Sequence, residues 1–227
     1  MVVGAWHTPH MDDERRQRLA EARLYLVCDA RPTRFLNAAL SGGVDIVQLR
    51  DKRLDDDGLV AASRRFREAC DAHSALFVLN DRPDLVAACE ADGVHVGQDD
   101  VPVTRARVLV GHDRLVGLST HSPAQVDAAE GVDYIAVGPV HETPTKPGRP
   151  AAGLDPIRHA AAHAPFPWFA IGGLDELTIG DAIRAGGRRA VVVRAITEAA
   201  DPEATARALR TALDAHPLEV EARVGAT

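Results

Sequence analysis

This sequence has few aromatic residues, a negative net charge and no long apolar runs. Five Phe, two Tyr and two Trp make up only 4% of the 227 residues, which is too few for the stacking platforms that hold single-stranded nucleic acid. The net charge of −7 also argues against a nucleic-acid partner. No apolar stretch is long enough to span a membrane, and the first residues contain no apolar segment of signal-peptide length. We therefore expect neither a nucleic-acid-binding protein nor a membrane protein.

Cysteines are also few. Cys28, Cys70 and Cys89 are odd in number and widely spaced, so the sequence predicts neither a disulfide framework nor a thiolate zinc site. A reducing, cytoplasmic environment is the simplest interpretation.

What the chain does contain is a repeated alternation. Short apolar or β-branched runs alternate with longer stretches rich in Ala, Leu and Arg that have helical spacing. This alternation predicts parallel strands joined by helices. The expected strands begin at Leu24, Asp45, Ala75, Gly93, Leu115, Asp133, Phe166 and Arg189. The helical stretches include residues 54–73, 83–91, 102–110, 123–130, 177–185 and 202–216.

Eight such units predict a single (β/α)8 barrel, or TIM barrel. A doubly wound open sheet is the main alternative, but it would carry a glycine-rich turn where Asp29 to Pro32 follow the first strand. We expect residues 24–216 to form the barrel. Residues 1–23 would be an N-terminal extension with a charged helix from His10 to Ala22, and residues 217–227 a disordered tail.

Polar residues at strand ends are the candidates for function, because the active site of this fold lies at the carboxyl ends of the strands. The second strand ends in Gln48, Arg50 and Lys52, which the alternation of a strand places on one side. The alternative to a binding site is a solvent-exposed run of charged residues that nearby aspartates balance. The position of the run favours a site for an anionic, phosphorylated substrate.

The next two strand ends supply carboxylates. Asn80 and Asp81 follow the third strand, and Asp100 lies in the loop after the fourth. Two neighbouring carboxylates suit Mg²⁺, which fills its other positions with water and phosphate oxygens. Considered individually, Asp81 or Asp99 could instead cap the helix that follows it rather than bind a metal. The nearby cations favour the metal, because Mg²⁺ and cations together neutralise a diphosphate.

Later loops provide further phosphate-binding candidates. The loop after the sixth strand is the longest, and we expect its hydroxyls and Lys146 to contact a phosphate. Gly172 and Gly173 end the seventh strand, and Val193 and Arg194 end the eighth. The loops after the seventh and eighth strands are the usual phosphate-binding site of this fold.

Histidines receive no catalytic role. His95 stands on a strand and is expected to be packed and hydrogen-bonded, whereas His121 and His141 have no partners at metal-ligand spacing. No arrangement of a Ser or Cys nucleophile with a His is evident.

Seven motifs in one order resemble the thiamine-phosphate synthase family between Leu24 and about His216. They are QLRDK at 48–52, LNDRPDLV at 79–86, ADGVHVGQDD at 91–100, GLSTHS at 117–122, VGPVHETPTKPG at 137–148, AIGG at 170–173 and VVVRAI at 191–196. The resemblance implies a transferase that condenses 4-amino-2-methyl-5-(diphosphooxymethyl)pyrimidine with 4-methyl-5-(2-phosphooxyethyl)thiazole. The products would be thiamine phosphate and diphosphate, with diphosphate leaving before the thiazole nitrogen attacks.

The resemblance also implies roles for single residues. Those that would hold the pyrimidine diphosphate are Gln48, Arg50, Lys52, Asn80, Ser119 and Lys146. Of these, Arg50, Lys52 and Lys146 would stabilise the departing diphosphate. The Mg²⁺ ligands would be Asp81 and Asp100. Those that would hold the thiazole phosphate are Thr143, Thr145, Gly173, Val193 and Arg194. Some family members have Ser where Arg194 stands, which leaves a side-chain role for Arg194 open.

Two rival functions share the expected fold. A thiazole tautomerase would keep the thiazole-phosphate site but would not need the diphosphate and metal residues. A noncatalytic phosphate-sensing barrel would bind ligand without turnover, because fold does not dictate function. The complete set of Gln48, Arg50, Lys52, Asp81 and Asp100 favours the synthase. Whether the chain forms a homo-oligomer is not indicated by the sequence.

Overall fold

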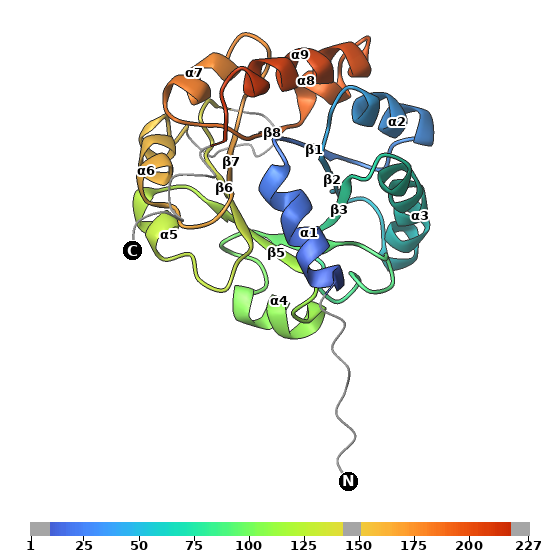
Figure 1. Cartoon of the computed structure of the whole chain (residues 1–227). Helices are drawn as coiled ribbons and strands as arrows, with labels where there is room; N and C mark the ends of the chain where they lie inside the picture. The colour runs from blue at the N-terminus through green and yellow to red at the C-terminus, as the bar shows by residue number, and fades with distance from the viewer. Residues whose placement is uncertain (1–9, 143–150, 219–227) are drawn as a thin grey trace.

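The computed structural model is a closed barrel of eight parallel strands with helices around it (Figure 1). It describes residues 10–142 and 151–218. The strands are β1 (Leu24–Cys28), β2 (Ile46–Leu49), β3 (Leu76–Asn80), β4 (Gly93–Val96), β5 (Leu115–Thr120), β6 (Tyr134–Val137), β7 (Trp168–Ile171) and β8 (Ala190–Val192). Each strand pairs with the next in sequence, and β8 pairs with β1 to close the barrel. The (β/α)8 prediction and all eight strands are confirmed.

One helix precedes the first strand, and the helices that follow most of the strands cover the outside of the barrel. They are α1 (His10–Glu21), α2 (Thr33–Ser41), α3 (Asp56–Ala72), α4 (Val103–Val110), α5 (Pro123–Asp127), α6 (Asp155–His163), α7 (Ile179–Arg184), α8 (Arg194–Thr197) and α9 (Pro202–Asp214). Side-chain caps start several of them. Asp55 accepts the N–H of Gly58 at the start of α3, and Asp201 accepts that of Ala204 at the start of α9. No described helix is long and apolar enough to cross a membrane.

The period-two alternation of each strand separates two apolar layers. In β1, Leu24 and Leu26 pack with the surrounding helices, whereas Tyr25 and Val27 belong to the barrel interior. In β2, Leu49 faces the helices, and the buried Gln48 hydrogen-bonds to the interior residue Tyr25. The sequence prediction that Gln48 and Leu49 face opposite sides is therefore confirmed.

One predicted helix is wrong. Residues 83–91 form a series of turns between β3 and β4. Their N–H groups reach back by three, four or five residues, as from Glu90 to Ala87, from Cys89 to Leu85 and from Ala91 to Val86. Glu90 also has a φ of 53°, outside the helical region. The connection is short and must bury Val86, Cys89 and Ala91 before β4 begins, and irregular turns satisfy that requirement.

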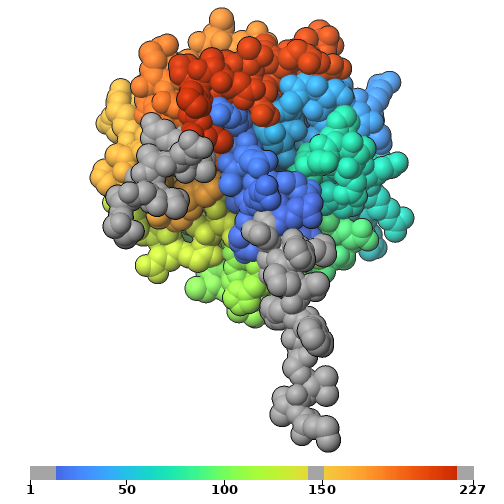
Figure 2. All heavy atoms as spheres, in the orientation of Figure 1, coloured from blue at the N-terminus to red at the C-terminus, as the bar shows by residue number. Residues whose placement is uncertain are grey.

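The amino ends of the strands are closed by α1, and we call this end the barrel floor. Figure 1 shows α1 lying across the centre of the barrel, and Figure 2 shows it filling the middle of this face between its neighbours. Leu19 and Ala22 are buried and pack with interior residues such as Tyr25 and Leu115. This helix matches the charged segment expected from His10 to Ala22, and its place in the fold is that of a plug.

Three aspartates, each directly before an even-numbered strand, organise the barrel floor. Asp45, Asp92 and Asp133 precede β2, β4 and β6. Each accepts a main-chain N–H from the preceding strand, donated by Leu24, Phe77 and Val116 respectively. Each also accepts an arginine from a surrounding helix. These arginines are Arg210 for Asp45, Arg67 for Asp92 and Arg107 for Asp133.

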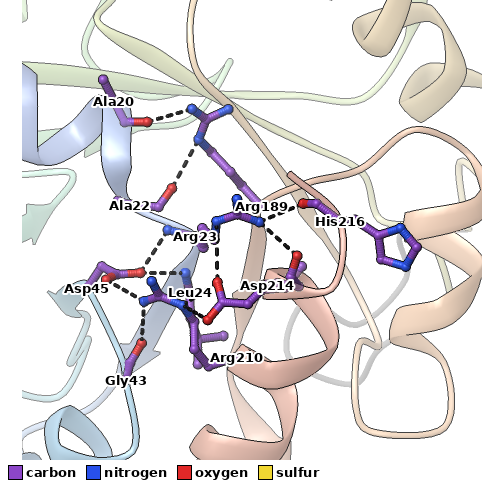
Figure 3. Close-up of polar contacts among 11 residues, drawn as sticks. Ala20, Ala22, Arg23, Leu24, Gly43, Asp45, Arg189, Arg210, Asp214 and His216 are labelled. Carbon is purple, nitrogen blue, oxygen red and sulfur yellow. Dashed lines mark hydrogen bonds and ion pairs between the residues drawn. The ribbon is translucent and has the colours of Figure 1, made fainter. Parts of the chain in front are cut away.

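Helix α1 is held to this ring of aspartates by its own arginines. Arg15 Nε lies 2.9 Å from Asp92, and Arg16 Nε lies 3.0 Å from Asp133. Arg189, directly before β8, donates instead to the carbonyls of Ala20 and Ala22 (Figure 3). These contacts fix both the helix and its end to the barrel.

Candidate active site

The second-strand residues predicted to bind an anion lie at the carboxyl end of β2 and in the loop after it. Gln48 is only 3% exposed, whereas the side chain of Lys52 is 60% exposed. Arg50 is held by a hydrogen bond of 2.8 Å from its N–H to the carbonyl of Cys28. In the part of the chain that the structure describes, its guanidinium makes no ion pair. A cation without a carboxylate partner is available to an anionic ligand.

The two predicted metal ligands lie next to each other. Asp81 Oδ2 accepts a hydrogen bond of 2.8 Å from Lys52 Nζ, and its Oδ1 accepts one of 3.0 Å from Asn80 Nδ2. Burial raises the pKa of Asp81, and the negative charge and close approach of Asp100 raise it further against the lowering effect of Lys52. Asp100 Oδ2 is held by the N–H of Gly97 at 2.9 Å. Like charges placed together in this way favour a bound cation.

Among the described residues, no cluster of three or more His, Cys, Asp or Glu residues is arranged to hold a metal ion. Among the described residues, the Asp81–Asp100 pair is the candidate for the protein ligands of a metal ion. This donor set fits Mg²⁺, which takes one or two carboxylates and leaves room for water and phosphate oxygens. It does not fit a structural zinc site, which needs four protein ligands.

Replacing Asp81 with Asn is expected to stabilise the metal-free protein. The neutral amide removes the repulsion between Asp81 and Asp100 and can donate a hydrogen bond to Asp100. Asn also tolerates the φ of 59° at this position. We expect the free energy of unfolding to rise by about 0.5–1 kcal/mol without metal. Urea unfolding with and without Mg²⁺ measures this, and an Asp81→Asn protein less stable than the wild type without metal would contradict it.

A cavity of about 900 Å³ opens at the carboxyl ends of β5 to β8. Four of the predicted substrate-binding residues line it. They are Ser119, Gly173, Val193 and Arg194. The structure thus brings together the predicted phosphate residues of the late strands in one cavity. The residues of β2 to β4 lie on the other side of the barrel mouth and are not part of its lining.

The double glycine after β7 also has a packing role. Gly172 and Gly173 have φ values of 108° and 64°. A Cβ at Gly172 would lie 2.4 Å from Pro139 Cα, and one at Gly173 would lie 2.7 Å from His141 Cβ. The loop after β6 rests on these glycines through hydrogen bonds from Val140 and His141 to the carbonyls of β7 and Gly172. Larger residues would push this loop away from the cavity.

Three predicted residues lie outside the described part of the chain. They are Thr143, Thr145 and Lys146. Their assignments to the phosphates stay predictions.

Sequence reasoning missed a buried chain of hydrogen bonds that crosses the barrel interior. Gln48 Nε2 donates to Tyr25 Oη, and Tyr25 Oη lies 3.0 Å from Tyr134 Oη. Tyr134 Oη lies 3.2 Å from His95 Nδ1, and His95 Nε2 lies 2.9 Å from Ser119 Oγ. The chain joins Gln48 on one side of the mouth to Ser119 on the other. The two tyrosines of the sequence both stand on predicted strands, but no local pattern pairs residues that are 109 positions apart.

His95 lies on β4, and His121 and His141 lie in the loops after β5 and β6. His95 is 6% exposed and hydrogen-bonded through both ring nitrogens, so the prediction of a packed histidine is confirmed. His121 Nδ1 lies 2.6 Å from the carbonyl of Gly138. His141 Nε2 lies 3.6 Å from Asp181 Oδ2, away from the predicted metal ligands.

Comparison with known proteins shows which family the chain belongs to. The family model described as thiamine monophosphate synthase matches residues 24–196. The chain belongs to this family. It is 55% identical over 212 residues to the thiamine-phosphate synthase of Thermobifida fusca, covering 89% of this chain and 97% of the relative. It is 53% identical over 213 residues to that of Saccharopolyspora erythraea, covering 87% and 96%.

The structure agrees with the family as well. A solved thiamine phosphate pyrophosphorylase from Pyrococcus furiosus superposes with a TM-score of 0.78 at 26% identity, covering 88% of this chain and 98% of that one. A 3-hexulose-6-phosphate synthase superposes with a TM-score of 0.60 at 24% identity and shares the fold alone. The resemblance seen in the motifs is therefore confirmed, and this thiamine-phosphate synthase family member carries its polar residues at the barrel mouth.

Proposed function

We propose that this protein condenses 4-amino-2-methyl-5-(diphosphooxymethyl)pyrimidine with 4-methyl-5-(2-phosphooxyethyl)thiazole to give thiamine phosphate and diphosphate. Membership of the thiamine-phosphate synthase family supports this transferase activity in thiamine biosynthesis. The observation that favours it over a tautomerase is the close pair of Asp81 and Asp100 beside Lys52. A barrel that only isomerised the thiazole would not need a paired-carboxylate site.

Asp81 and Asp100 are the proposed ligands of Mg²⁺. When bound, the ion would neutralise charge on the diphosphate. Lys52 pairs with Asp81 in the metal-free chain, and its exposed ammonium is free to turn toward phosphate oxygens. Surface ion pairs of this kind contribute little stability, so the exchange of partners costs little.

Arg50, Lys52 and Lys146 are the proposed groups that stabilise the departing diphosphate. Fixed cations that face the developing charge lower the barrier without rearrangement during the reaction. Gln48, Asn80 and Ser119 are the proposed polar contacts of the pyrimidine diphosphate. No side-chain nucleophile is required, because the C–O bond to the diphosphate breaks before the thiazole nitrogen forms the new C–N bond.

The cavity on the β5–β8 side is the proposed place of the thiazole phosphate. Gly173, Val193 and Arg194 line it, and their main-chain groups are the proposed phosphate contacts, together with the hydroxyls of Thr143 and Thr145. Holding the two substrates face to face across the mouth supplies the proximity part of catalysis.

A direct assay tests the function. Purified protein is mixed with both substrates and Mg²⁺, and thiamine phosphate and diphosphate are measured. Formation of both products supports the synthase. Isomerisation of a thiazole substrate alone would favour the tautomerase, and binding without any product would favour a sensor.

Replacing Arg50 with Ala is expected to reduce kcat/KM for the pyrimidine diphosphate by about 100-fold, because a charge-assisted contact to the diphosphate is lost. KM for the thiazole phosphate is expected to stay within threefold. Steady-state kinetics with each substrate varied in turn measures the difference. Arg34→Ala, which removes an exposed cation from α2, is the matched control. Equal losses in the two variants would show that only general charge attraction is involved.

The compartment and the binding partners follow from the same proposal. All three cysteines are free and buried, which supports a reducing, cytoplasmic location. The proposed partners are the two small-molecule substrates.

A further inference from the structure

The hydrogen-bond chain through the barrel interior connects residues of five different strands. It runs from Gln48 on β2 through Tyr25 on β1, Tyr134 on β6 and His95 on β4 to Ser119 on β5. The two ends are proposed substrate contacts, whereas the three middle residues carry no role in the reaction described above. Their polar atoms lie in an apolar layer formed by residues such as Ile46, Leu115 and Phe169.

The phenols are fixed in place. Tyr25 and Tyr134 have no exposed surface, and Phe169 packs edge-on against both rings at centroid distances of 5.6 and 5.8 Å. A Cβ at Gly117 would lie 2.1 Å from Tyr134 Cζ. Only glycine at this position of β5 leaves room for the Tyr134 ring in the barrel interior. Such close packing leaves the hydroxyl of Tyr134 no freedom to leave the chain.

The available protons determine which group donates in each bond of this hydrogen-bond chain. Gln48 Nε2 can only donate, so Tyr25 Oη accepts from it; the proton of this buried hydroxyl then has Tyr134 Oη as its acceptor among the described residues. Tyr134 then donates to His95 Nδ1, so the proton of the neutral imidazole is on Nε2, which donates to Ser119 Oγ. Burial raises the pKa of both phenols, so each keeps the proton that this count requires. The hydroxyl proton of Ser119 is the one left over for a ligand.

We propose that Tyr134 is a positioning residue, which acts through His95 to make the Ser119 hydroxyl a hydrogen-bond donor toward the substrate in the barrel mouth. This inference rests on the proposed function for the identity of that substrate. Tyr25 extends the chain to Gln48 but is not needed to set the tautomer of His95. The two tyrosines thus have separable effects, although both are buried and their hydroxyls are in contact.

The first experiment reads the tautomer of His95 by ¹⁵N NMR of the ligand-free protein, with the resonance identified by its absence in His95→Gln. The wild type is expected to carry the proton on Nε2. Tyr134→Phe removes the donor to Nδ1 and is expected to give a mixture of tautomers, whereas Tyr25→Phe is expected to keep the wild-type form. A proton on Nδ1 in the wild type would overturn the proposed direction.

The second experiment measures kinetics of the same variants. Tyr134→Phe is expected to lower kcat about 10-fold or more while KM for the thiazole phosphate stays within threefold. Phe169→Leu, which removes ring packing but no hydrogen bond, is the matched control for a loosened interior and is expected to lower the melting temperature without changing the His95 tautomer. Unchanged tautomer and unchanged kcat in Tyr134→Phe would overturn the proposal.

The two proposals can fail separately. If the wild type makes no thiamine phosphate, the proposed function fails, and the tautomer measurement still reports whether Tyr134 controls His95. If the wild type is active and His95 carries its proton on Nε2 whether or not the Tyr134 hydroxyl is present, the inference fails and the function stands.

Discussion

Asp100→Asn is expected to reduce kcat at least 100-fold at limiting Mg²⁺. Asn keeps the shape of the side chain, and its amide oxygen can still accept the N–H of Gly97, which now lies 2.9 Å from Asp100 Oδ2. The loop is therefore expected to keep its form while one of the two carboxylates is lost. Because metal and cations together stabilise the leaving diphosphate, weakening the metal site removes stabilisation of the transition state. Activity against Mg²⁺ concentration measures the loss.

The control for this experiment is Asp57→Asn. Asp57 is exposed in the first turn of α3, which starts at the same end of the barrel, so the substitution changes the net charge equally. Its activity is expected to stay within twofold of the wild type. Direct binding of Mn²⁺, followed by electron paramagnetic resonance, separates loss of the metal from loss of the fold. An Asp100→Asn protein with near-normal activity at limiting Mg²⁺ would refute the assignment of this residue.

The barrel could be predicted because its evidence is local. A strand such as β2 shows its two faces in four consecutive residues, and the polar ends of strands mark the mouth without knowledge of the rest of the chain. This local pattern predicts Gln48, Asp81 and Asp100 as candidate site residues, and the structure places them at or just after the carboxyl ends of β2, β3 and β4. The apolar spacing of residues 83–91 predicts a helix, but these residues form turns that bury Val86, Cys89 and Ala91 before β4 begins.

The interior hydrogen-bond chain could not be predicted because it is non-local. Tyr25 and Tyr134 are 109 residues apart in sequence, and their contact depends on how strands on opposite sides of the closed barrel face each other. The plug formed by α1 is similar. Its sequence predicts a charged helix, but Leu19 and Ala22 alone do not say which surface they cover.

The second large expected effect is a loss of stability when an aspartate of the barrel floor is removed. Asp92→Ala is expected to lower the free energy of unfolding by about 3 kcal/mol. The side chain of Asp92 is 6% exposed and pairs with Arg15 of α1 and Arg67 of α3, each 15% exposed. It also accepts the N–H of Phe77 at 2.9 Å. Without the carboxylate, Arg15 and Arg67 each lose their buried partner, and the buried N–H of Phe77 loses its acceptor.

The pH dependence of stability gives an independent test of Asp92. Burial would raise the pKa of its carboxyl, but Arg67, the Phe77 N–H and Arg15 outweigh burial and lower the pKa below its usual value. A lowered pKa contributes stability that is complete above the unfolded-state pKa of about 3.9 and is lost as the pH falls through the folded-state value. The wild type should therefore lose stability below about pH 4 more steeply than Asp92→Ala does.

Asp71→Asn separates this buried carboxylate from an exposed one that pairs with the same arginine. Asp71 Oδ1 lies 2.7 Å from Arg67 Nη2, but the side chain of Asp71 is 64% exposed. The free energy of unfolding of Asp71→Asn is expected to fall by less than about 0.5 kcal/mol, because water replaces the Asp71 carboxylate beside Arg67 at little cost. Urea unfolding of both variants at neutral pH measures the difference. Similar small losses would mean that Arg15 and Arg67 turn to water when Asp92 is removed, and that α1 is held to the barrel by Leu19 and Ala22 rather than by its charges.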